Sequence, residues 1–132
     1  MTTMDDLAAF ITARLDEDEA MAKLAAREGG TWTQDDPERR PGAISSAGGQ
    51  VVYDEGAPDE YQAAHIARHD PARVLREVAA KRAMVADHGP SEVAPDACRR
   101  CKGGMAFPCR TIRHLAAAWS DHPDYRAGWA TA

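Results

Sequence analysis

The chain has 132 residues, of which 28% are charged and only 6% aromatic, and its formal net charge is −5. This length predicts one small domain, whose core is built from Ala, Leu, Val and Met rather than from aromatic rings. No apolar run approaches the roughly 18 residues of a membrane-spanning helix, and the acidic N-terminus lacks the features of a signal peptide. We therefore expect a cytoplasmic protein without a membrane anchor.

The charge is distributed unevenly along the chain. Residues 1–60 contain fourteen acidic and five basic residues, whereas residues 61–132 contain seven acidic and eleven basic residues. A basic half can approach a phosphate backbone, while an acidic half is repelled by one. The acidic half is equally suited to a basic protein partner.

The N-terminal segment has the pattern of a helix. Apolar residues from Leu7 to Leu24 recur near the helical period, which predicts a helix over residues 5–27. The glycine pair at 29–30 ends it. The acidic run at 16–19 is expected to lie in solvent, as charge runs on helices usually do.

Two short β-prone runs follow, at residues 31–33 and 50–53. The segment between them is rich in Gly, Pro and Ser, which is typical of a loop. We expect a two-stranded antiparallel ribbon joined by a mobile loop over residues 31–54. Because an isolated ribbon is marginally stable in water, Trp32 and Tyr53 are expected to pack onto the helices.

The second half of the chain is predicted to form three further helices. Asp70 is a good N-cap and is followed by Pro, so helices over residues 59–69 and 71–88 are expected to meet at a bend. Pro108 opens a last helix over residues 108–120, and residues 121–132 form a tail. The sequence predicts a single mainly α-helical domain over residues 1–132 with a small β-ribbon, of the α+β class.

The three cysteines of the chain all lie within twelve residues of one another, at Cys98, Cys101 and Cys109. A Cys-x2-Cys pair places two thiolates on one tight knuckle, where they can bind one soft cation. Cys109 falls in the first turn of a predicted helix, where the helix dipole favours a thiolate. This pattern predicts a structural Zn²⁺ ion.

A fourth ligand completes a tetrahedral Cys3His site. His88 ends one predicted helix where the cysteine loop begins, and His114 is the runner-up. The resulting zinc knuckle over residues 88–109 would link the helix that ends at His88 to the helix that begins at Pro108.

Other readings of these residues remain open. The cysteines could be three unrelated buried thiols or a redox pair, although no βαβ pattern precedes the motif. A catalytic zinc is disfavoured because no His-Glu-x-x-His motif supplies a base. His65 and His69 have the i, i+4 spacing of helical metal ligands, but exposed helical histidines explain them better.

Basic residues crowd the cysteine segment, namely Arg99, Arg100, Lys102, Arg110 and Arg113. They can balance the negative charge of a zinc–thiolate centre, or they can contact phosphates of a nucleic acid. The overall pI of about 5.5 argues against a nucleic-acid-binding domain, because such domains are usually basic.

Three segments make the sequence resemble a known family. They are HIARHDPARVLREVAAKR at residues 65–82, PCRTIR at 108–113 and DHPDYR at 121–126. The chain resembles, over nearly its whole length, a family of small proteins of unknown function from actinobacteria, especially Streptomyces, and from their phages and prophages. The resemblance implies an intracellular protein from a phage or mobile element, and it implies no activity.

These observations favour a small zinc-binding regulatory protein that binds another protein, such as a host regulator. The alternative is a nucleic-acid-binding regulator that uses the basic residues around the knuckle. A zinc-dependent enzyme is the third possibility and is disfavoured, since no catalytic motif is present. The sequence does not indicate an oligomeric state.

Overall fold

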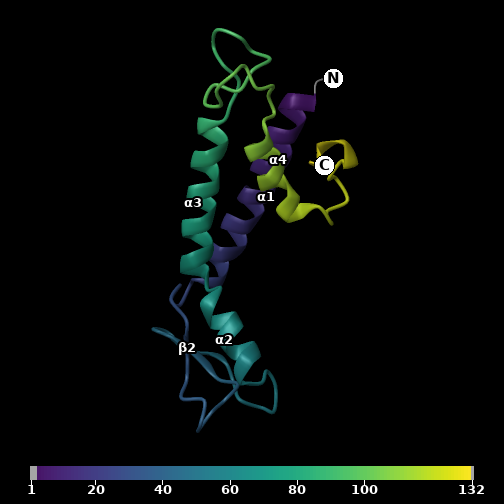
Figure 1. Ribbon diagram of the computed structural model, residues 1–132. Helices are drawn as coiled ribbons and strands as arrows, with labels where there is room; N and C mark the ends of the chain where they lie inside the picture. Colours follow the sequence, from purple (N-terminus) through teal and green to yellow (C-terminus); the bar gives the residue numbers. More distant parts are fainter. Residues whose placement is uncertain (1–2, 132) are drawn as a thin grey trace. The chain divides into compact units, whose positions relative to one another are not determined.

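The computed structural model describes residues 3–131, and it is mainly helical with one small antiparallel sheet (Figure 1). The helices are α1 (Thr3–Ala25), α2 (Glu60–Arg68), α3 (Pro71–Asp87) and α4 (Arg110–Ala116). The strands are β1 (Thr33–Gln34), β2 (Ile44–Ser46) and β3 (Gly49–Val52). Two short 3-10 helices, η1 (Ala117–Trp119) and η2 (Ala127–Trp129), lie near the C-terminus. Within the described residues, no helix is long and apolar enough to cross a membrane.

The chain divides into two compact units. One consists of Met1–Glu17 with Ala79–Ala132, and the other of Asp18–Val78. Both α1 and α3 therefore contribute residues to each unit. The single domain over residues 1–132 stays a prediction.

The unit of residues 18–78 contains the sheet, whose strand order is β1-β2-β3. The predicted two-stranded ribbon was wrong, because β2 pairs antiparallel with both β1 and β3. Ile44–Ser46 has only one apolar residue, so its strand is not visible as an alternating pattern. Tyr53, which we expected to pack onto the helices, is exposed.

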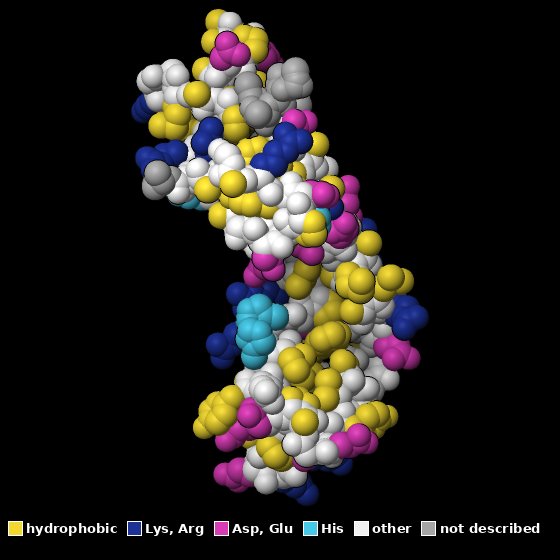
Figure 2. Space-filling view, turned by 90° about the vertical axis from the view of Figure 1, so that its right-hand side faces the viewer, with side chains coloured by type: hydrophobic (Ala, Val, Ile, Leu, Met, Phe, Trp, Pro, Cys, Tyr) yellow, Lys and Arg dark blue, Asp and Glu magenta, His cyan; other side chains and the backbone are white. Residues whose placement is uncertain are grey.

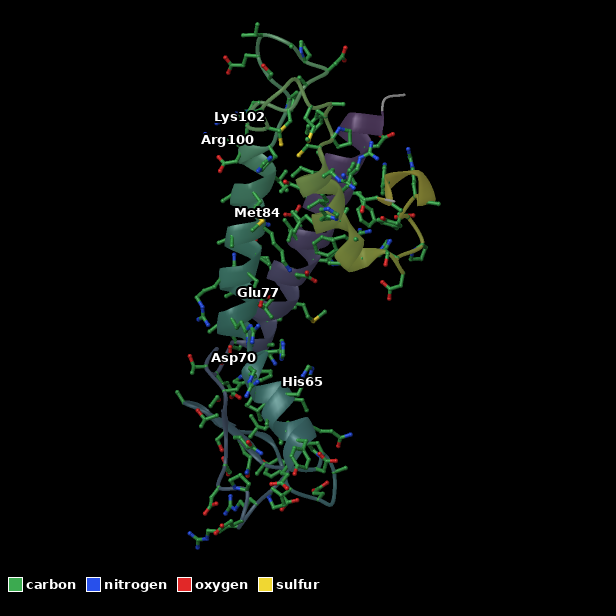
Figure 3. The ribbon with its side chains drawn as sticks, in the orientation of Figure 1. His65, Asp70, Glu77, Met84, Arg100 and Lys102 are labelled. Carbon is green, nitrogen blue, oxygen red and sulfur yellow. The ribbon has the colours of Figure 1, made fainter. Side chains whose placement is uncertain are left out.

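The junction between α2 and α3 follows the expected capping chemistry. Asp59 and Gln62 form a capping box at the start of α2. Asp70 is buried, and its carboxylate accepts hydrogen bonds from the backbone N–H groups of Arg73 and Trp32, both at 2.9 Å. Asp70, which lies where α2 meets α3 (Figure 3), therefore caps α3 and also bonds to the segment before β1.

The unit that contains both ends of the chain has a core formed by α1 and α4. Its largest fully buried side chains are Leu7, Ile11, Leu15, Ile112 and Cys109. The predicted helix over 108–120 is shorter in the structure, because Cys109 is the extended N-cap residue of α4 and the helix tightens into η1 after Ala116.

The C-terminal segment packs on α1 in the same unit. The ring of Phe10 contacts those of His122, Tyr125 and Trp129, with ring centroids 5.5, 6.0 and 5.1 Å away. Arg14 is buried, with its guanidinium over Phe10 and one nitrogen 2.7 Å from His122 Nε2. The predicted tail is thus an ordered segment held by aromatic contacts.

Candidate metal centre

The cysteine segment is a loop that turns back on itself between α3 and α4. Cys98 N–H donates to the carbonyl of Met105 at 2.8 Å, and Arg99 N–H donates to that of Gly89 at 2.8 Å. Gly103 and Gly104 have φ angles of 78° and 68°. These left-handed conformations suit glycine, and they let the chain reverse directly after the Cys-x2-Cys pair.

The loop brings the four predicted ligands into one cluster. The Nδ1 atom of His88 lies 3.5 Å from the Sγ of Cys98, 3.6 Å from that of Cys101 and 3.5 Å from that of Cys109. All four ligand atoms lie within 4.8 Å of one another. The cluster could therefore hold a metal ion.

These distances have the size that a tetrahedral zinc centre requires. With Zn–S bonds of about 2.3 Å and a Zn–N bond of about 2.1 Å, the tetrahedral angle separates nitrogen from each sulfur by about 3.6 Å. The three observed nitrogen–sulfur distances agree with this value. Soft thiolate ligands together with imidazole favour zinc over magnesium or calcium.

The elements around the loop set the position of each ligand. His88 continues the last turn of α3, since its N–H donates to the carbonyl of Met84 at 3.0 Å. Cys109 is the N-cap residue of α4 and is buried. Cys98 is also buried, whereas His88 and Cys101 are partly exposed. The cluster therefore lies near the protein surface, with Cys98 and Cys109 buried and His88 and Cys101 partly exposed.

The protein environment shifts the pKa values of two of the thiols in opposite directions. Burial raises the pKa of Cys98, but hydrogen bonds from the backbone N–H groups of Cys101 and Arg100 outweigh burial and lower this pKa to about 6. For Cys101, burial and the neighbouring sulfurs of Cys98 and Cys109 raise the pKa to about 11. In the metal-free protein, one thiolate is thus stabilised beside a thiol that keeps its proton.

The basic residues near the cluster have different surroundings. Arg100 forms an ion pair of 3.5 Å with Asp87, and Figure 3 shows Arg100 and Lys102 near the end of α3. Arg99 lies against Gly89, where an added Cβ would be 3.0 Å from the Arg99 guanidinium. Arg113 donates through Nε to the carbonyl of Pro108 at 3.1 Å. At least two of the predicted phosphate contacts are therefore engaged within the protein.

Arg110 and Arg113 also line a surface hollow beside Cys109, together with Pro108 and Thr131. No acidic residue lines this hollow. The pair adds positive charge next to a cluster that would be negative when it holds a divalent metal as three thiolates. This arrangement fits the charge-balancing role that the sequence suggested as one alternative.

The other histidines considered as ligands are not part of the cluster. His114, the runner-up, lies with Nδ1 3.4 Å from the hydroxyl of Thr131. The rings of His65, in α2, and His69, its C-cap residue, have centroids 4.3 Å apart, and His69 Nδ1 contacts the carbonyl of His65 at 2.9 Å. Within residues 3–131, the cluster of His88 and the cysteines is the only group of three or more such ligands.

Two contacts that shape the centre had no signal in the sequence. They are the short antiparallel bridges Pro90↔Cys98 and Ala97↔Ala106 inside the loop. A loop without hydrophobic periodicity gives no indication of such pairing, because single bridges depend on backbone groups rather than on side chains.

The fold and the cluster together define a small, mainly helical protein with a candidate Cys3His metal centre. Residues 4–131 match DUF6221, a family of unknown function, and the chain belongs to this family. No curated protein and no solved structure matches the chain. The function of this family is unknown.

Proposed function

We propose that this protein is a zinc-stabilised regulatory module that acts by binding another protein. The observation that carries the proposal is the cluster in which one imidazole nitrogen lies 3.5–3.6 Å from three cysteine sulfurs. The resemblance to small actinobacterial and phage proteins supports an origin in such a genome. The absence of an apolar membrane-spanning helix in residues 3–131 is compatible with this role.

The zinc in this proposal is structural. Four protein ligands would occupy all four positions of a tetrahedral zinc ion, whereas a catalytic zinc keeps one coordination position for water or substrate. The cluster joins the end of α3 to the start of α4 across a loop with little regular structure. A metal ion at this place would stabilise the fold, because the hydrophobic core of a small domain contributes little stability on its own.

Exposed apolar side chains support a binding role rather than a purely structural one. Met21 is 68% exposed and Leu24 is 59% exposed, although both belong to the apolar pattern of α1. Neighbouring apolar side chains left in solvent often mark a surface that binds a partner.

Metal analysis of the purified protein tests the centre. We expect about one equivalent of zinc, which Cys98→Ser and His88→Ala should each remove or strongly reduce. His114→Ala is the matched control, because it removes an imidazole outside the cluster and should leave the zinc content unchanged. Full zinc in His88→Ala together with loss in His114→Ala would move the fourth ligand to His114.

Nucleic-acid binding is the second candidate, and the basic side chains at the loop are what favour it. Its test is a gel-shift titration with DNA and RNA at increasing salt, since phosphate contacts weaken steeply with ionic strength. Charge reversal at Arg99 and Lys102 should abolish the shift if this candidate is correct. Salt-dependent binding that these changes remove would replace the protein-binding proposal.

A further inference from the structure

A shallow apolar groove of about 250 Å³ lies within the unit of residues 18–78. Its walls are apolar side chains from the C-terminal half of α1, the segment before β1 and the first turns of α3. These are Met21, Ala22, Ala25, Trp32, Pro71 and Val74, and the polar side chains of Asp18 and His69 complete the lining. The groove is outside the metal centre and has no part in the zinc proposal.

The walls of this groove are held in place by hydrogen bonds. The indole N–H of Trp32 donates to the carbonyl of Gly29 at 3.1 Å, and its backbone N–H donates to Asp70 at 2.9 Å. The backbone N–H of Ala72 donates to the carbonyl of Gly30 at 2.9 Å. A ligand therefore meets a preformed surface and does not have to order it, which lowers the cost of binding.

Beside the groove, α1 carries an exposed apolar ridge of two residues, Met21, which lines the groove, and Leu24, which does not. Met21 and Leu24 are one helical turn apart, and more than half of each side chain is in solvent. Figure 2 shows hydrophobic side chains gathered on one face of the molecule beside a patch of histidine. A groove between two helices with such a ridge is the kind of surface on which an amphipathic helix docks.

The net charge of this unit indicates which class of partner the groove favours. Residues 18–78 contain twelve acidic and seven basic residues, a net charge of −5, while the remaining residues contain nine of each. All of the net negative charge therefore belongs to the unit that contains the groove, and Asp18 lines the groove itself. This charge repels nucleic acids, anionic membranes and a second copy of the same unit, and it attracts a basic partner.

We propose that the groove binds an amphipathic helix with a basic polar face, supplied by a partner protein. Apolar side chains at i, i+3 or i+4, and i+7 of that helix would lie between α1 and α3, with its Lys and Arg side chains towards the acidic unit. This inference names the partner class for the interaction role proposed above and rests on that role.

The test uses the full-length, zinc-loaded protein and two synthetic peptides. Each peptide has about 18 residues, long enough for a helix, with Leu on one face and either Lys or Glu on the other. Fluorescence anisotropy of labelled peptide measures the affinity. We expect the Lys peptide to bind, with an affinity that falls as salt rises, and the Glu peptide to bind at least tenfold more weakly, a difference of about 1.4 kcal/mol.

Two matched variants locate the site. Met21→Asp places a charge on the groove wall and should weaken Lys-peptide binding about tenfold or more. Val93→Asp changes an apolar side chain that is 95% exposed in the other unit, so it should leave binding unchanged. Both positions are exposed, and a circular dichroism spectrum checks that each variant is folded.

Four outcomes would overturn the inference. Equal binding of the two peptides would remove the basic partner class and leave a general interaction role standing. Unchanged binding in Met21→Asp, or no binding of either peptide, would remove the groove as the docking site. A dimer in sedimentation that Met21→Asp dissociates would assign the groove to a second copy. The zinc content reports separately on the metal centre.

Discussion

At the scale of single residues, the candidate metal centre consists of four side chains with different environments. Cys98 and Cys109 are buried, and His88 and Cys101 lie nearer the solvent. The four residue types were predictable from the sequence, because soft ligands within a short segment are uncommon outside metal sites and redox pairs. The distances between their ligand atoms could not be predicted, because they depend on the backbone bridges within the loop.

Zinc affinity should fall as the pH is lowered from 7.5 to 5.5. Cys98 has a pKa of about 6 and is mainly a thiolate at pH 7.5, but it gains a proton as the pH falls through 6. Because protons and zinc compete for the same sulfur, each added proton weakens binding. Competition with a colorimetric chelator measures the affinity at each pH. An affinity that does not change over this range would show that these sulfurs are not the ligands.

Asp70→Ala should destabilise the zinc-loaded protein by about 2 kcal/mol. The change leaves two backbone N–H groups without their acceptor, one in α3 and one at Trp32. Asp59→Ala is the matched control, since that carboxylate caps α2 at an exposed position and should cost about 1 kcal/mol. Urea denaturation followed by circular dichroism gives both values. Equal losses of stability in the two variants would mean that the hydrogen bond from Trp32 to Asp70 does not stabilise the fold.

At the scale of elements, the turn after the Cys-x2-Cys pair depends on two glycines with positive φ. Gly104→Ala should lower the free energy of unfolding by about 1 kcal/mol, because an L-residue is strained at a φ of 68°. Gly128→Ala is the control, since its φ is not positive and a Cβ there meets nothing within 4 Å. Thermal unfolding of both variants checks the difference. Equal stability of the two would remove the strain argument.

The helices were largely predictable and the sheet was not. Asp70 followed by Pro71 marked the start of α3 correctly, because capping chemistry is local. Strand β2 was missed, since two of its three residues are serines that are also typical of loops. Leu24 fits the helical period of α1 yet lies mostly in solvent. Periodicity indicates which face of a helix is apolar, but it does not show how far along the helix that face is covered.

At the scale of the whole molecule, the two compact units should respond differently to metal removal. The four ligands all lie in the unit formed by residues 1–17 and 79–132. Treatment with a chelator should therefore increase amide hydrogen exchange in residues 88–113 far more than in strands β1 to β3. Exchange followed by mass spectrometry measures both regions. A uniform increase across the chain would show that the units unfold together.

The loop that carries the ligands also carries Arg99, Arg100 and Lys102, three basic residues within four positions. Trypsin-like proteases cut after such residues, but only where the chain can straighten in their active site. The backbone hydrogen bonds from Cys98 to Met105 and from Arg99 to Gly89 prevent this while the loop is folded. If zinc keeps the loop folded, loss of zinc would expose these three basic residues to such proteases.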